Sequence, residues 1–214
     1  IGVVRRADVQ KAVQQQASET LLKFAGIVGG EEFRSMSLRL RSARRLSWLS
    51  INILLNVLAA SVIAYYQDTL AAVISLAVFL PIVSDMSGCS GNQAVAVSMR
   101  ELVLGLIKPH EVLRVIWKEA SVGVVNGAVL GIILGGVAFL WKGNPTLGLV
   151  VGAALALNTV VAVCLGGAIP LLLRKLRQDP ALASGPILTT ITDMCGFFFV
   201  LSFARAALPW LVGS

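Results

Sequence analysis

Long apolar stretches dominate this sequence and leave few options for its fold. Five of them follow one another between Trp48 and Val212, and a helix of about 20 apolar residues crosses the hydrocarbon core of a bilayer. Only 14% of the residues carry a charge, whereas soluble domains are about one-quarter charged. The sequence therefore predicts an all-α fold, a polytopic membrane bundle of five transmembrane helices. The expected spans are residues 48–66, 69–97, 120–141, 147–173 and 186–208.

The excess of basic residues lies where membrane topology explains it. Lysine and arginine number 18 against 11 acids, for a formal net charge of +7. They gather before the first span, between the second and third, and after the fourth, which the positive-inside rule assigns to the cytoplasm. We expect a cytoplasmic N-terminus, an outward C-terminus, a multi-pass position in the cell membrane and no nucleic acid partner. The residues are Arg39, Arg41, Arg44, Arg45, Arg100, Lys108, Arg114, Lys118, Arg174, Lys175 and Arg177.

The first 47 residues are polar and differ from the rest of the chain. They lack the order of charged, apolar and cleavage-site regions that marks a signal peptide, so we expect the C-terminal part of a longer protein. Residues 1–4 look strand-like, and Asp8 is expected to cap a helix. A second helical stretch is expected over residues 18–25, ended by glycines from Gly26 onward.

Two acids, Asp85 and Asp193, lie inside the apolar stretches. A charge at the centre of a membrane helix costs about 2.5–3.5 kcal/mol on insertion scales, so such a residue is a functional candidate by default. The alternative is a carboxyl group satisfied by hydrogen bonds between helices. Threonines share the face of Asp193, and a preceding Gly-Pro pair can free a backbone carbonyl. Oxygen ligands of these kinds suit hard cations such as Mg²⁺. The expected ligands are Asp193, Thr189 and Gly185, beside Thr190 and Gly196.

A second cluster of polar and small residues lies in the second span. Such a cluster can line a pore, or it can let helices pack closely, as small residues do in membranes. The sequence leaves both interpretations open. Asn126 and Asn158, in the third and fourth spans, are expected to donate hydrogen bonds between helices. The cluster comprises Asp85, Gly88, Cys89, Gly91, Asn92 and Gln93.

A single carboxylate is a poor site for a divalent cation. A twofold axis would bring two copies of Asp193 together and double the negative charge, so a homodimer is the expected assembly. Two other functions stay open: an intramembrane aspartyl protease pairing Asp85 with Asp193, whose Gly-x-Gly-Asp motif is missing, and a non-conducting scaffold. The sequence has no phosphate loop or nucleotide fingerprint, so no organic cofactor is expected.

Two segments resemble the MgtE family of magnesium channels and transporters. The run PIVSDMSGCSGNQ, residues 81–93, is similar to the motif of the family's second membrane helix. Residues 170–193 are similar to its fourth-to-fifth helix segment, with a basic loop, Asp179-Pro180, two threonines and Asp193 in the same order. The resemblance covers essentially the whole chain.

The resemblance implies Mg²⁺ influx through a pore on the axis of a homodimer in the lipid membrane. It implies that Asp193 binds the cation and that Gly88 and Gly91 line the pore. The other expected pore-lining residues are Asn92, Asp85, Thr190 and Gly196. Co²⁺, Mn²⁺ and Ca²⁺ are the other divalent ions that such a site would have to sort, by cavity size and retained waters.

The resemblance also divides the chain into three parts. Residues 1–14 resemble the tail of a CBS regulatory domain, and residues 15–46 the cytoplasmic connecting (plug) helix with its basic juxtamembrane segment. Residues 47–214 would form the conducting domain. Expected cation sensors are Glu19, Glu31 and Glu32. The chain departs from the family pattern where Ser87-Gly88-Cys89 replaces Gly-Gly-Asn and where Gln14–Gln16 replace acids.

Overall fold

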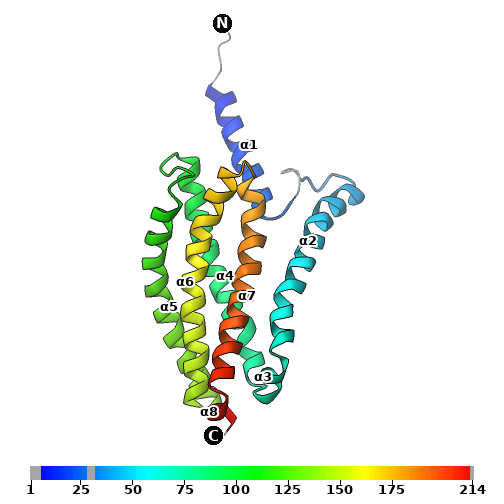
Figure 1. Cartoon of the computed structure of the whole chain (residues 1–214). Coiled ribbons are helices and arrows are strands. Elements are labelled where there is room, and N and C mark those ends of the chain that lie inside the picture. Colours follow the sequence, from blue (N-terminus) through cyan, green and yellow to red (C-terminus); the bar gives the residue numbers. More distant parts are fainter. Residues whose placement is uncertain (1–5, 28–31, 213–214) are drawn as a thin grey trace.

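The computed structural model describes residues 6–27 and 32–212, and every regular element in them is an α-helix. The prediction of an all-α fold is confirmed. Figure 1 shows the long helices side by side, with α1 and α8 at opposite ends of the bundle. The helices are α1 (Arg6–Phe24), α2 (Leu38–Tyr65), α3 (Gln67–Ala72), α4 (Leu76–Val103), α5 (Val112–Lys142), α6 (Pro145–Lys175), α7 (Pro180–Ala206) and α8 (Leu208–Val212).

Four helices are long and apolar enough to cross a membrane by length and composition: α2, α5, α6 and residues Ser184–Ala206 of α7. The sequence predicts five spans. The fifth, α4, is 28 residues long, but its serines, Asp85, Asn92 and Gln93 make it less apolar. It packs against both α6 and α7 in the same bundle. Among the described residues, only these four helices thus meet the criterion for a membrane span. That α4 also crosses the membrane stays a proposal.

The N-terminal region differs from the prediction. α1 is one helix rather than two stretches, because the glutamines and alanine between them are good helix formers. Asp8 lies in the first turn and not at the N-cap, where its carboxylate still complements the helix dipole. The strand-like residues 1–4 lie outside the part of the chain that the structure describes.

α1 ends at Phe24, and Gly26 terminates it as predicted. Gly26 has a φ of +81°, and its N–H donates to the Lys23 carbonyl over 2.9 Å. The Ile27 N–H donates to the Leu22 carbonyl over 3.0 Å, which completes a Schellman motif. A Cβ at Gly26 would also lie 2.3 Å from Cδ1 of Trp48 in α2. The left-handed backbone and the close approach both require glycine here.

The expected second span, residues 69–97, is broken near its start. α3 ends at Ala72 and α4 begins at Leu76, so a turn takes up the length that one helix over this range would have had. Pro81 lies inside α4 without ending it, and the helix continues to Val103. α4 can therefore lie along α6 and α7 over its whole 28 residues.

The core lies along α6, which packs against α4, α5 and α7. Glycines allow the closest approaches. A Cβ on Gly131 or Gly135 of α5 would lie 2.6 or 2.7 Å from a backbone oxygen of α6. Toward α4, a Cβ on Gly166 would lie 2.2 Å from the carbonyl oxygen of Gly91. Backbones this close leave no room for a side chain, as at other small-residue helix contacts in membranes.

α2 lies at the edge of the bundle and packs mainly against α7 (Figure 1). Its one buried residue among those described is Ala59, and apolar side chains such as Ile53 and Leu54 are exposed. Near α3, the hydroxyls of Tyr66 and Ser202 lie 2.8 Å apart and join α2 to α7. So much exposed apolar surface is typical of a helix that faces lipid or another subunit.

Candidate cation site in the helical bundle

The helix that carries Asp193 has a well-defined start. α7 begins at Pro180, whose missing N–H costs nothing at the first helical position. Asp179 caps the helix, accepting a hydrogen bond of 3.0 Å from the Ala181 N–H. Asp193 lies three to four turns further along, half-buried in the middle of the bundle. Its place on α7 is therefore set by local sequence signals.

Asp193 is hydrogen-bonded across the bundle. The hydroxyl of Ser84 in α4 donates to Oδ1 of Asp193, and Ser84 itself is buried. Sequence reasoning missed Ser84, because a neutral serine does not stand out in an apolar helix as a charged residue does. The other carboxylate oxygen makes no hydrogen bond to another side chain in the described part of the chain. Asp193 is thus hydrogen-bonded to α4 through one carboxylate oxygen, and its other oxygen can still coordinate a cation or accept a hydrogen bond.

Asp85 lies one residue beyond Ser84 on α4 and is exposed on the surface of the single chain. Because the Ser84 hydroxyl donates to Asp193, Asp85 lies next in sequence to the point where α4 contacts that carboxylate. The two acids predicted as functional candidates therefore come from different helices and meet at one level of the bundle. No hydrogen bond joins them in the residues that the structure describes.

The predicted ligands Thr189 and Gly185 lie on the same helix and contact each other. The Thr189 hydroxyl donates to the Gly185 carbonyl over 2.9 Å. At the next residue, the Thr190 hydroxyl donates to the Pro186 carbonyl over 2.8 Å. Both hydroxyl protons are thus directed back along α7, which leaves the hydroxyl oxygens free to accept or to ligate a cation. Thr189 is exposed, whereas Thr190 is buried.

The glycines of α4 and α7 have different surroundings. Gly91 is packed tightly, because a Cβ there would lie 2.9 Å from the Ala162 carbonyl oxygen of α6. A Cβ on Gly88 would approach only Thr192 Oγ1, at 3.9 Å. The geometry at Gly91 favours the helix-packing interpretation that the sequence left open. Gly88 has space for a side chain toward α7.

Asn158 of α6 confirms one prediction and adds an observation. It is fully buried, and its Nδ2 donates to the Thr192 carbonyl of α7 over 3.0 Å. This is the expected hydrogen bond between helices. A Cβ on Gly196 would lie 2.8 Å from the same nitrogen. The Asn158 Oδ1 has no hydrogen-bond partner among the described residues. Thr192 immediately precedes Asp193, so Asn158 holds the backbone beside the carboxylate.

The outward face of α4 is polar. Cys89 and Gln93 are exposed and Asn92 is half-buried, in line with Asp85. No group of three or more His, Cys, Asp or Glu side chains that could hold a metal occurs in residues 6–27 and 32–212. The oxygen set of one chain is therefore a carboxylate with hydroxyls and carbonyls, which resembles part of a site for a hard cation.

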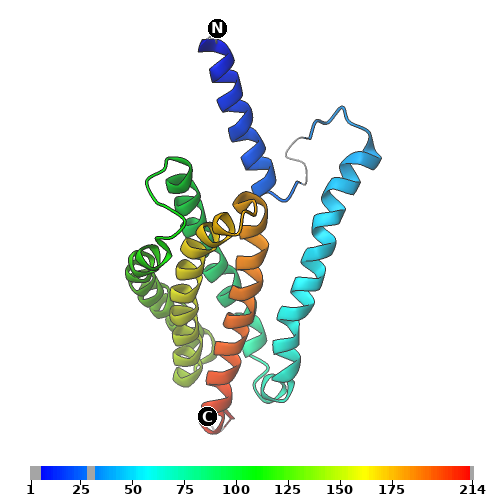
Figure 2. The same ribbon diagram turned by 45° about the horizontal axis from the view of Figure 1, so that its top comes forward.

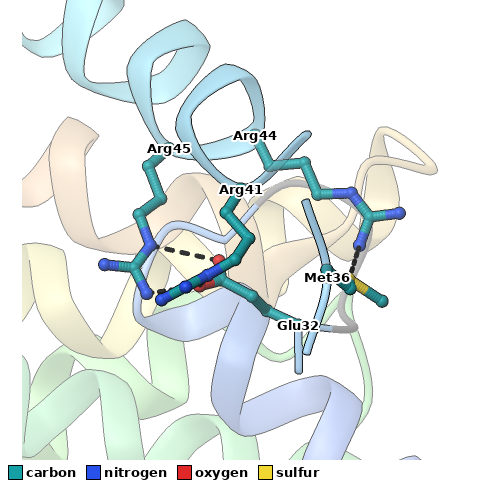
Figure 3. A network of polar contacts seen from close by, with 5 residues as sticks. All are labelled: Glu32, Met36, Arg41, Arg44 and Arg45. Atoms are coloured by element: carbon teal, nitrogen blue, oxygen red, sulfur yellow. Dashed lines mark hydrogen bonds and ion pairs between the residues drawn. The ribbon is translucent and has the colours of Figure 1, made fainter. Parts of the chain in front are cut away.

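The acids expected to sense cations are placed differently from one another. Glu19 lies on α1 and is half-buried, and Glu31 lies outside the described residues. Glu32 is enclosed by two arginines of α2, as Figure 3 shows, and its side chain is only 5% exposed. The hydrogen bond from Arg45, with a second from Arg41, holds the Glu32 pKa below its ordinary value. The negative charge of Glu32 is thus already balanced by arginines of the protein itself.

Residues 80–203 match the family model MgtE, which is described as a divalent cation transporter. This chain belongs to the MgtE family. The match runs from α4 through most of α7 and contains Ser84, Asp85, Asn158 and Asp193. The resemblance stated from the sequence is confirmed. A family of transporters also agrees with the prediction that the chain is not an enzyme, and it gives the protease alternative no support.

Curated relatives agree with the family match. The chain is 34% identical over 206 residues to the magnesium transporter MgtE of Bacillus subtilis, covering 96% of this chain and 46% of the relative. It is 32% identical to the MgtE proteins of Enterococcus faecalis and Thermus thermophilus, covering 99% and 97% of this chain and 46% of each relative. The chain thus spans about half the length of the curated relatives it matches.

Proposed function

We propose that this chain of the MgtE family forms the membrane part of a Mg²⁺ transporter. In this proposal Mg²⁺ enters along its electrochemical gradient through a pore on the axis of a homodimer, with Asp193 as the cation-binding carboxylate. The observation that carries the proposal is the contact of α4 with α7, in which Ser84 donates to Asp193 and the exposed Asp85 lies next to Ser84 on α4. The magnesium transport named for the relatives supports the choice of ion.

The polar face of α4 supports a path between two subunits. Asp85, Cys89 and Gln93 are exposed in a single chain, on a helix flanked by membrane-spanning helices. Such side chains are costly against lipid and need protein or water beside them. A second copy related by a twofold axis would cover this face and bring a second Asp193 to the same level. Two carboxylates and retained waters suit Mg²⁺, which dehydrates reluctantly.

The arrangement of loops supports the expected topology. The basic connections α4–α5 and α6–α7 lie at the same end of the bundle as α1, while the α2–α3 turn lies at the end of α8 (Figure 1). With α4 as a fifth span, the basic end would be cytoplasmic by the positive-inside rule. We propose that residues 1–14 end a regulatory domain, residues 15–46 connect it, and residues 47–214 conduct, in the cell membrane.

The membrane potential would drive this entry. An inside-negative potential favours a divalent cation by about 4.6 kcal/mol per 100 mV, twice the value for a single charge. No coupled ion is required for influx. Closing of the pore would then depend on cations at Glu19, Glu31 or Glu32. Since Arg45 and Arg41 form ion pairs with Glu32, a cation that binds this carboxylate would have to displace two guanidinium groups.

The proposal is tested by Mg²⁺ uptake into liposomes that contain the purified chain and an internal Mg²⁺-sensitive dye. Asp193→Asn keeps the size of the side chain and removes its charge, so uptake should fall to that of empty liposomes. Asp68→Asn is the matched control, because Asp68 is an exposed acid on α3, and it should leave uptake unchanged. Normal uptake by Asp193→Asn would remove the carboxylate from the mechanism. No uptake by any variant would favour a scaffold.

The dimer pore has a separate test. Cys89 is exposed on the polar face of α4, whereas Cys164 and Cys195 are half-buried. A short thiol-reactive cross-linker should join two chains through Cys89 in membranes, and Cys89→Ser should abolish the cross-linked dimer. A dimer in which Cys89 stays uncross-linked would place the α4 faces apart and contradict a path between them.

A further inference from the structure

A polar cavity lies at the end of the bundle near α1, away from Asp193. It has a volume of about 730 Å³ and is bounded by α1, the end of α4, the end of α6 and the start of α7. Figure 2 shows the end of α1 close to the start of α7, and residues of both helices line the cavity. No residue proposed to line the cation path lies in it, and of the proposed cation sensors Glu19 does. The cavity therefore calls for an explanation of its own.

The charges that line the cavity do not cancel. Three cations face it, Lys23, Arg174 and Arg177, against two acids, Glu19 and Asp179. Lys23 is paired with Asp179 over 2.9 Å. The two arginines are exposed and make no ion pair within the part of the chain that the structure describes. Two guanidinium groups, from residues three apart in the sequence, are thus left without an ion-pair partner among the described residues.

Arg177 is held in an uncommon backbone conformation. Its φ is +58°, the only positive value for a non-glycine residue in the described chain. It lies where α6 ends in a Schellman motif: the Arg177 N–H donates to Arg174 over 3.2 Å, and the Gln178 N–H to Leu173 over 2.9 Å. Glycine is the usual residue at this position, because it has no steric penalty there. An arginine at this position costs free energy in the backbone, which suggests that its side chain has a function.

We propose that this cavity binds a phosphate-bearing anion through Arg174 and Arg177. Guanidinium groups match phosphate oxygens with two parallel hydrogen bonds and stay charged at every physiological pH. Gln178 adds an amide donor, and Met99, Leu102 and Val103 supply an apolar wall. The cavity lies at the ends of the membrane helices, so an anionic phospholipid headgroup with part of its chain fits this lining. Free phosphate offers the same chemistry without the apolar contact.

The test measures binding to the full chain purified in detergent, with three probes. The probes are short-chain phosphatidic acid, short-chain phosphatidylcholine as the zwitterionic control, and inorganic phosphate. We expect phosphatidic acid to bind more tightly than phosphatidylcholine. Binding of inorganic phosphate with equal affinity would identify a free-phosphate site, and weaker binding a lipid headgroup site. Equal binding of the two lipids, with none of inorganic phosphate, would overturn the proposal.

Variants separate the site from general surface charge. Arg174→Gln and Arg177→Gln should each weaken phosphatidic acid binding about tenfold, the value of one charge-assisted hydrogen bond. Lys175→Gln removes the same charge next to them but does not line the cavity, and it should bind normally. Arg177→Gly should relieve the backbone and raise the melting temperature while losing affinity. Equal losses in Lys175→Gln, or full affinity in Arg177→Gly, would contradict the assignment.

Discussion

Gly135 and Gly136 are neighbours in α5, yet replacing them by alanine should have opposite effects on stability. A Cβ on Gly135 would lie 2.7 Å from the Gly148 carbonyl oxygen of α6, whereas one on Gly136 would meet nothing within 4 Å. Alanine favours a helix over glycine by about 1 kcal/mol at either position. At Gly136 this gain stands alone, so Gly136→Ala should stabilise the fold by up to about 1 kcal/mol.

At Gly135 a steric cost outweighs the same gain. The obstacle is backbone, so α5 and α6 must move apart until the contact reaches 3.4 Å, where ordinary van der Waals distances begin. That movement also opens the close contacts of Gly131 and Gly127 with α6. Overpacking costs about 1–3 kcal/mol, and the loss of neighbouring contacts puts this case near the upper limit. We expect Gly135→Ala to destabilise the protein by about 1–2 kcal/mol net.

Thermal unfolding of the two purified variants in the same detergent checks this pair. The midpoint should fall for Gly135→Ala and stay equal or rise for Gly136→Ala, relative to the unchanged protein. Because the residues are adjacent in α5, their level along the helix and the change in helix propensity are nearly matched, and the contact with α6 is the main difference. Shifts of the same sign and size would refute the argument that backbone contact between α5 and α6 decides the outcome.

Three further predictions concern hydrogen bonds and ion pairs. Ser84→Ala removes the donor that orients the intramembrane carboxylate of α7; Mg²⁺ uptake into liposomes should fall several-fold with the elution profile unchanged, and an unaltered rate would contradict a positioning role. The hydrogen bond to Asp179 raises the Lys23 pKa above 10.5. The stabilisation of α1 by this pair is therefore complete below pH 10.5 and is lost as the pH rises through the raised pKa. Protease cleavage of α1 should increase at such high pH, and also at neutral pH in Lys23→Met. The arginines of α2 lower the pKa of Glu32 from 4.5. The stabilisation that Glu32 gives to the start of α2 is therefore present above pH 4.5 and is lost as the pH falls through the lowered pKa. Hydrogen exchange near the start of α2 should rise at that pH, and exchange that does not change with pH would contradict this prediction.

Much of the fold could be predicted because its signals are local. Apolar length predicted helices in the regions of α2, α5, α6 and α7, and Gly26 ended α1 as its backbone freedom suggests. Asn158 was expected to donate between helices, since a buried amide in an apolar helix needs a partner, and it donates to α7. The same local logic missed the break before α4. That break follows from how the chain reverses after α2.

The candidate site was only half predictable. Asp193 and Asp85 stand out because a charge is rare and costly in an apolar helix. Ser84 does not stand out, since serine is neutral and common, yet it is the residue that meets Asp193 across the bundle. Gly91 carried two interpretations from sequence, and its contact with α6 is what favours packing. Residue type alone contains no information about which neighbour a small side chain faces.

The sequence by itself determined which segments are helical and apolar, where the basic loops lie and which acids are placed at depth, because hydropathy and charge belong to single segments. Only the tertiary structure decided that Ser84 reaches Asp193, 109 residues away along the chain. It also decided which glycines of α5 touch α6 and that Arg174 and Arg177 share a cavity with α1. These relations depend on the register between helices, which is set by the fit of many side chains at once and not by the pattern within any one helix.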